Sequence, residues 1–189
     1  IHLDTGWFRK DWQCEWAFNP ETFPDPPAYF QAMRAKGMRV SLWQNPSIAP
    51  GTLRYDEAVN KRYLAPIPRQ SGSGSDFGGI AYGGNIDFSN PEAIRWYQGL
   101  LKDLLEMGAA AIKTDFGEKI NEHADYATLP WHRLHNLYSL LYQRSAYEVT
   151  EATTGEGIIW ARAGWTGCQR YPVHWGGDCA CSWDGLAGS

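Results

Sequence analysis

The amino-acid sequence predicts an α/β fold built around a parallel β-sheet. Two observations carry this prediction: short apolar segments alternate with longer amphipathic ones, and a polar or aromatic residue stands at or shortly after the end of each short segment. Parallel strands need crossover connections, which helices usually provide. The chain has 189 residues, which is enough for one domain with a sizeable core.

Five short apolar segments are predicted as strands. They span residues 1–3, 39–42, 109–114, 157–161 and 171–175. The first four are typical of short buried strands. The fifth is weaker, because Pro172 lacks an N–H group and can sit only at the start or the edge of a strand.

Three helices are predicted between the strands, over residues 26–36, 90–107 and 131–152. Asp25 is the predicted N-cap of the first helix, and Gly37 ends it. Asn90 is the predicted N-cap of the second helix, and Gly108 follows its end. The apolar residues of this second helix recur at spacings of three and four, which is typical of an amphipathic helix.

In a (β/α)₈ barrel the chemistry gathers at the carboxyl ends of the strands. The five predicted strands lead to Asp4, Trp43, Asp115, Arg162 and Asp178. A doubly wound sheet would also place a site there, but the sequence has no Gly-rich phosphate loop between a strand and a helix. We therefore predict an incomplete (β/α)₈ barrel with about five βα units, since a full barrel takes roughly 250 residues. The 189 residues are expected to be part of a larger catalytic domain.

One long segment, residues 46–86, interrupts this alternation. It contains several prolines and the run Ser-Gly-Ser-Gly-Ser at residues 71–75. Loops of this length in a compact domain are usually functional or mobile. Because the segment follows a barrel strand, we expect a long loop or insertion that forms part of the pocket wall. For residues 71–75 alone, a flexible tip is favoured.

Composition excludes several classes of protein. The net charge of −4 argues against a nucleic-acid-binding protein. The chain has no run of 18 apolar residues, so no segment is expected to span a membrane. The first residue is Ile, so we expect the true N-terminus to be missing, and the location is left open with the cytoplasm favoured. Neither the four cysteines nor the histidines have metal-binding spacing, so no metal or cofactor is expected.

Two aspartates are the main catalytic candidates. A pair of carboxylates, each at the end of a buried strand, can cleave a glycosidic bond. Asp115 could act as a nucleophile, although it could also be a helix N-cap or a structural partner of Lys113 or Arg162. Asp178 follows two glycines that allow a close backbone approach, although an aspartate after Gly-Gly is also a common turn residue.

Further polar and aromatic residues surround this pair in the predicted arrangement. Arg162 could bind sugar hydroxyls or form a buried ion pair, and Asp4 could accept hydrogen bonds from two adjacent hydroxyls. Trp43 and Trp175 are candidate walls of a sugar pocket, since aromatic faces stack on sugar rings. Glu118 is expected to orient a neighbouring side chain.

Two sequence runs resemble motifs of glycoside hydrolase family 31. The run from Lys113 to Glu118 (KTDFGE) resembles the nucleophile motif of the bacterial α-xylosidase branch, and the run from Arg162 to Asp178 resembles the acid/base region. They occur in the family's order and at a similar separation, and the resemblance covers nearly the whole chain. It implies that an N-terminal β-domain, the last barrel strands and the C-terminal domains lie outside it.

The resemblance also implies a retaining α-glycosidase with Asp115 as nucleophile and Asp178 as acid/base. The implied residues of the subsite for the cleaved sugar are Asp4, Trp43, Lys113, Phe116, Arg162 and Trp175. The segment 46–86 resembles the insertion after the third barrel strand, so the predicted strands would be the second to the sixth. The implied partner is an oligosaccharide or glycoside, and the full-length protein could form a homo-oligomer.

The residues after Asp4 bear on sugar specificity. In well-understood α-xylosidases of the family, Cys-Phe stands at this position and crowds the space of a glucose hydroxymethyl group. Here Thr5 and Gly6 are smaller and could leave room for a larger sugar. The expected activity is that of an α-xylosidase acting on terminal non-reducing sugars. The alternatives are an α-glucosidase or α-transglycosidase of the same family, and a non-catalytic carbohydrate-binding protein or inactive fragment.

Overall fold

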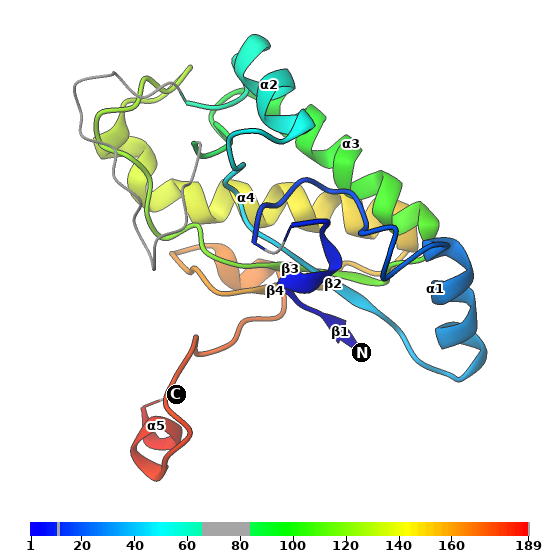
Figure 1. Cartoon of the computed structure of the whole chain (residues 1–189). Helices are drawn as coiled ribbons and strands as arrows, with labels where there is room; N and C mark the ends of the chain where they lie inside the picture. The colour runs from blue at the N-terminus through cyan, green and yellow to red at the C-terminus, as the bar shows by residue number, and fades with distance from the viewer. Residues whose placement is uncertain (11, 66–83, 189) are drawn as a thin grey trace.

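A computed structural model of the protein describes residues 1–10, 12–65 and 84–188. A parallel sheet with the strand order β1-β2-β3-β4 lies at its centre (Figure 1). The strands are β1 (His2–Leu3), β2 (Ser41–Gln44), β3 (Ala111–Thr114) and β4 (Ile159–Ala161). All three pairings are parallel between strands consecutive in sequence, as in a (β/α)₈ barrel.

The first four predicted strands are confirmed, and the fifth was wrong. Residues 171–175 run beside β4 and exchange backbone hydrogen bonds with it, but they pair only as an isolated parallel bridge between His174 and Ala161. Pro172 explains the difference, because it has no N–H group with which to continue a hydrogen-bonded ladder.

The helices are α1 (Pro26–Ala35), α2 (Leu53–Asn60), α3 (Pro91–Met107), α4 (Trp131–Thr154) and α5 (Trp183–Ala187). Helices α1 to α4 lie in the connections between the strands, whereas α5 follows β4 and lies apart from the sheet (Figure 1). The predicted N-caps are confirmed, since the side chain of Asp25 accepts a hydrogen bond from the Ala28 amide and that of Asn90 from the Glu92 amide. Gly108 ends α3 as predicted.

The segment 46–86 contains more regular structure than its prolines suggested. Thr52 caps helix α2 through its side chain, and two antiparallel bridges join the ends of the segment. These bridges link Ser47 to Asn85 and Leu64 to Ile86. The run at residues 71–75 lies outside the described residues.

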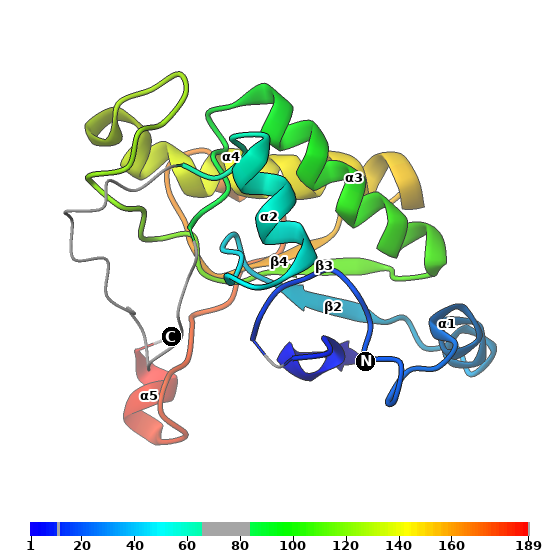
Figure 2. The same ribbon diagram turned by 45° about the horizontal axis from the view of Figure 1, so that its top comes forward.

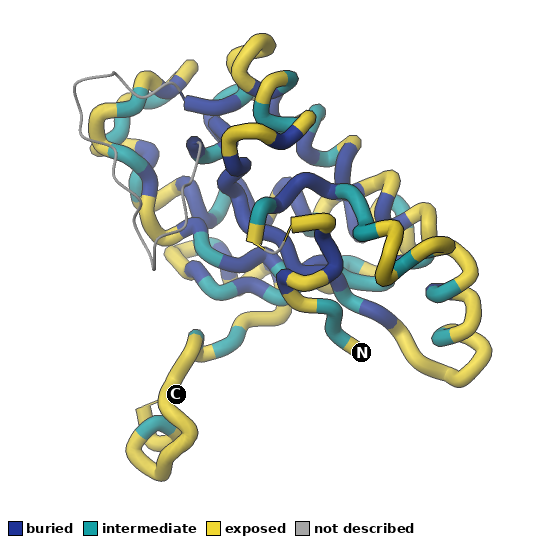
Figure 3. The backbone as a smooth tube through the Cα atoms, in the orientation of Figure 1, coloured by how far each residue is buried: buried dark blue, intermediate teal, exposed yellow. Residues whose placement is uncertain are grey.

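The two faces of the sheet have different chemistry. Leu42, Ile112 and Ile159 are fully buried in the core, and α3 and α4 lie side by side along one side of the sheet (Figures 1 and 2). Figure 3 shows this core as the dark blue centre of the molecule, whereas the segment around α5 is mostly exposed. Among the described residues, none of the helices is both long and apolar enough to cross a membrane.

Gly108 provides a test of the packing between α1 and α3. It has a φ of +127°, and a Cβ atom there would lie 2.6 Å from Phe30 Cβ. We expect Gly108→Ala to lower the free energy of unfolding by about 1–3 kcal/mol, because it adds backbone strain and overpacks the contact.

Gly99→Ala is the matched control. Gly99 lies within α3, and a Cβ atom there would meet nothing within 4 Å. This replacement should stabilise the protein by about 0.5–1 kcal/mol through helix propensity. Denaturant unfolding measures both changes, and effects of the same sign would contradict the packing account.

Candidate active site

The carboxyl ends of the strands bring the predicted site residues to one edge of the sheet. Asp4 follows β1, Asp115 follows β3 and Arg162 follows β4, so these three lie at the same end of parallel neighbours. Trp43 lies within β2, opposite Lys113 of β3 in the register. The structure therefore gathers side chains that are far apart in sequence.

Asp115 is held in one orientation by three contacts. Its carboxylate is buried, with 6% of the residue exposed. Oδ2 accepts a hydrogen bond of 2.7 Å from Trp43 Nε1, and Oδ1 accepts one of 2.9 Å from the Phe116 amide. Oδ1 also lies 3.0 Å from Arg162 Nη1. A carboxylate fixed in this way is oriented before substrate arrives, as a nucleophile requires.

Arg162 contacts three carboxylates. Its Nε donates a hydrogen bond of 2.6 Å to Glu118, which orients the guanidinium as expected from the sequence. Nη1 lies 3.0 Å from Asp115 Oδ1 and 3.7 Å from Asp178 Oδ2. The guanidinium carbon also lies 3.8 Å from the centre of the Phe116 ring. Burial lowers the pKa of Arg162, but the hydrogen bond to Glu118 and the nearby carboxylates outweigh it and raise the pKa.

Asp178 reaches the site from the segment that follows the bridge to β4. Its side chain is 86% exposed, in contrast to that of Asp115. Because Asp115 and Asp178 contact the same nitrogen of Arg162, their nearest oxygens are separated by no more than the sum of those two distances. The two carboxylates thus share one site.

A second charged cluster lies beside this pair. Lys113 Nζ lies 2.9 Å from Asp4 Oδ2, and 4.9 Å from the ring centres of both Trp160 and Trp175. His2 Nε2 lies 2.8 Å from the same Asp4 oxygen. The two aromatic rings attract the ammonium group of Lys113 through cation–π interactions.

The hydrogen bond with His2 lowers the pKa of Asp4. Partial burial opposes this effect, and Lys113 and the Thr5 amide add to the lowering. Asp4 is therefore ionised at any pH above its ordinary pKa of 3.8. Its carboxylate can accept hydrogen bonds throughout that range.

Trp43 was predicted from the sequence as a wall of the sugar pocket. Its ring is completely buried, and Phe8 and Trp12 contact it edge-on. What Trp43 contributes in this arrangement is the hydrogen bond to Asp115. Of these three rings, that of Trp12 is the exposed one.

Thr5 and Gly6 begin the short 3₁₀-helix η1 (Thr5–Trp7) directly after Asp4. Thr5 is buried, whereas Gly6 is exposed and a Cβ atom there would meet nothing within 4 Å. There is therefore space for a side chain at residue 6, beside Asp4.

Helix α4 supports the turn that carries Asp115. The Tyr142 hydroxyl donates to the Asp115 carbonyl at 3.1 Å and accepts from Gln44 Nε2 at 2.8 Å. Phe116 and Gly117 both have left-handed backbones, with φ of +56° and +93°. A Cβ atom on Gly117 would lie 2.9 Å from the Tyr142 ring. Burial raises the pKa of Tyr142, so its hydroxyl remains a neutral donor.

Sequence reasoning missed Tyr142, His2 and Trp160. Strand alternation could have found the last two, because His2 and Trp160 stand two residues before Asp4 and Arg162 and so point to the same faces as those residues. Tyr142 offers no local signal, since its role depends on how α4 packs against β3.

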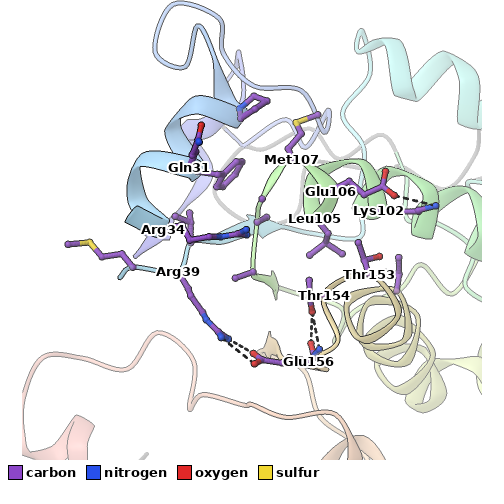
Figure 4. A pocket seen from close by; sticks show the side chains of 18 of the residues that line it. Gln31, Arg34, Arg39, Lys102, Leu105, Glu106, Met107, Thr153, Thr154 and Glu156 are labelled. Carbon is purple, nitrogen blue, oxygen red and sulfur yellow. Dashed lines mark hydrogen bonds and ion pairs between the residues drawn. The ribbon is translucent and has the colours of Figure 1, made fainter. Parts of the chain in front are cut away.

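A cavity of about 1140 Å³ lies at the opposite end of the sheet (Figure 4). Its lining includes Val40 and Ala110, which precede β2 and β3, and the last turns of α3 and α4. Figure 4 shows Arg39 paired with Glu156 at its side. Barrel chemistry takes place at the carboxyl ends of the strands, so this cavity is not the catalytic candidate.

The cysteines form no bonds with one another. Cys14 and Cys168 are buried and Cys179 and Cys181 are exposed, and none of the four is in a disulfide. Across residues 1–10, 12–65 and 84–188, no group of three or more potential ligands from His, Cys, Asp and Glu gathers in a way that could hold a metal ion.

Fold and site together define a parallel α/β barrel fragment in which Asp115, directly after β3, and Asp178 both contact Arg162. A family model described as the TIM-barrel domain of glycosyl hydrolases family 31 matches residues 1–189. The chain belongs to glycoside hydrolase family 31. Membership supports glycosidase activity without resolving which sugar is cleaved.

Individual relatives differ in the substrates their names imply. An α-xylosidase from Emericella nidulans is 32% identical, covering 100% of this chain and 25% of that protein. A sulfoquinovosidase from Escherichia coli is 31% identical, covering 95% of this chain and 28% of that protein. The chain thus spans about a quarter of the length of these curated relatives.

A solved structure supports the fold. The structure of a family 31 α-xylosidase from a soil metagenome, complexed with xylose, matches with a TM-score of 0.85 at 23% identity. The match covers 100% of this chain and 28% of that one. It shows that the sheet and its helices are part of a (β/α)₈ barrel.

Tyr142→Phe tests whether α4 positions Asp115. Removing the hydroxyl leaves the packing against Gly117 intact but loses both hydrogen bonds. In the full-length protein we expect kcat for an aryl α-glycoside to fall about tenfold or more, because small displacements of a reacting group are costly. KM should change little.

Tyr138→Phe is the matched control, since Tyr138 is equally buried on α4 and its hydroxyl donates to Ile86 instead. Both variants should lose about 1 kcal/mol of stability. If kcat falls equally in both, Tyr142 has only a structural role.

Proposed function

We propose that the chain is part of the catalytic domain of a retaining α-glycosidase that releases terminal non-reducing α-linked sugars, with xylose as the preferred sugar. The observation that carries this proposal is the contact of Asp115 and Asp178 with the same nitrogen of Arg162. Carboxyl groups of retaining enzymes stand about 5–5.5 Å apart, which is within the limit set by this shared contact.

In the first step, a carboxylate oxygen of Asp115 attacks the anomeric carbon of the bound sugar. The bond between that carbon and the glycosidic oxygen breaks, and Asp178 donates a proton to the departing oxygen. The product is a glycosyl-enzyme ester. The buried, triply held Asp115 suits nucleophilic attack, and the exposed Asp178 suits proton exchange with solvent.

In the second step, a water molecule attacks the anomeric carbon of the ester. Asp178, now a carboxylate, takes the proton from this water, and Asp115 leaves as a carboxylate. Two displacements restore the original anomeric configuration. Arg162 stays cationic throughout and balances the negative charge as it moves between the two aspartates.

The second charged cluster is proposed to bind the cleaved sugar. Asp4 accepts hydrogen bonds from hydroxyl groups, and Lys113 donates them. The Trp160 and Trp175 rings, which pack edge to face against each other, both contact the Lys113 ammonium and limit its movement. Together with Phe116 and Arg162, these residues form the proposed subsite.

Two features bear on the choice of sugar. The run from Lys113 to Glu118 and the similarity to the Emericella nidulans α-xylosidase favour xylose. The open space at Gly6 favours a second candidate, an α-glucosidase or α-transglycosidase, because a glucose hydroxymethyl group needs more room. The presence of both aspartates around one cation argues against a non-catalytic sugar-binding protein.

Paired variants of the full-length protein test the catalytic roles. Asp115→Gly should abolish turnover of an aryl α-glycoside, and added azide should restore product as the β-glycosyl azide, because azide replaces the missing nucleophile on one face. Asp178→Ala with azide should give the α-glycosyl azide, because azide attacks the glycosyl-enzyme. Nuclear magnetic resonance identifies the anomers.

Unchanged kcat in Asp115→Gly would remove this residue from the mechanism. A wild-type enzyme that first releases the inverted anomer would show that hydrolysis does not proceed by two displacements.

Gly6→Phe tests the space beside Asp4. A phenyl group there should occupy room that a glucose hydroxymethyl group needs, so kcat/KM for an aryl α-glucoside should fall about tenfold relative to the α-xyloside. Gly6→Ala is the control and should change the ratio less than threefold. An unchanged ratio in Gly6→Phe would mean that residue 6 does not face the sugar.

A further inference from the structure

The loop after β1 carries an aromatic side chain that the catalytic proposal leaves unused. An antiparallel bridge between Phe8 and Phe18 closes this loop. Within it, Trp12, Cys14 and Trp16 all have left-handed backbones, with φ of +68°, +36° and +49°. Such backbones are unfavourable for bulky side chains and persist only where the surroundings enforce them.

Buried side chains hold the loop in place. The Cys14 thiol accepts a hydrogen bond from the Asn45 amide and donates one to the Asn45 carbonyl, both at 3.4 Å. Trp16 packs edge-on against Trp96 and Tyr97 of α3. The loop is thereby attached to the end of β2 and to α3.

Trp12 is held differently from these anchors. It is 39% exposed, and its ring packs against that of Trp43 in an edge-to-face arrangement, with the ring centres 5.6 Å apart and an angle of 76° between the planes. Trp43 is itself covered and donates its hydrogen bond to Asp115. Trp43 therefore contacts both Asp115 and Trp12, and Trp12 is the exposed aromatic ring of this series.

We infer that Trp12 is the stacking platform for a second sugar ring, the one that leaves when the terminal sugar is cleaved. This inference rests on the proposed function, because it places the cleaved sugar at Asp115. An indole offers a large rigid surface for the apolar face of a sugar and loses little conformational entropy on binding. The anchored loop keeps that surface in position.

The test compares two substrates in the full-length protein. A xylosyl–glucose disaccharide with an α linkage has a second ring, whereas α-xylosyl fluoride has none. In Trp12→Ala, kcat/KM for the disaccharide should fall about tenfold, which corresponds to about 1.4 kcal/mol, mainly through KM, because the second sugar ring loses its stacking contact. The value for the fluoride should stay within about twofold.

Trp12→Phe should recover part of the loss, because it keeps an aromatic face. Met38→Ala is the control for removing an exposed apolar side chain, since Met38 precedes β2 at the end of the sheet away from Asp115. Equal losses of kcat/KM on both substrates, or no loss on either, would contradict the stacking role of Trp12 while leaving the proposed function intact. A wild-type protein that cleaves neither substrate would overturn both.

Discussion

The rest of the site depends on the ion pairs of the Arg162 guanidinium. Three carboxylates, from Asp115, Glu118 and Asp178, meet this one cation at the edge of the sheet. Removing one partner of a buried ion pair leaves the other charge unpaired at a cost in stability. Without Arg162, Asp115 would therefore be repelled by Glu118 and Asp178 with no cation to offset the repulsion. The parallel register of β3 and β4 brings Arg162 to Asp115, because each residue directly follows its strand.

The two faces of the sheet divide stability from chemistry. Leu42, Ile112 and Ile159 bury their side chains against α3 and α4, whereas alternate positions on the same strands carry Lys113 and Trp160. Tyr142 links the helical layer to the site, because its hydroxyl donates a hydrogen bond from α4 to the backbone carbonyl of Asp115. The position of Asp115 therefore depends on how α4 packs against the sheet.

Much of the fold followed from local signals. The strands end where apolar runs meet polar residues, and Asp25 and Asn90 cap their helices as predicted. The fifth strand failed because a ladder needs N–H groups along its length, and Pro172 has none. Helix α2 was hidden by flanking prolines.

The site could be predicted in part for the same reason. Residues that end strands were identifiable, whereas Tyr142 and Trp12 depend on contacts between distant segments and on an unusual backbone.

The turn after Asp115 has a consequence for changing this protein by design. Its left-handed residues bring the Phe116 amide to the carboxylate of Asp115, so part of the orientation of the proposed nucleophile is encoded within three consecutive residues. Other residues of the proposed sugar subsite lie on other loops, Asp4 after β1 and Trp175 after β4. Specificity could thus be rebuilt around an unaltered reacting group, and new substrates could be reached without redesigning the chemistry.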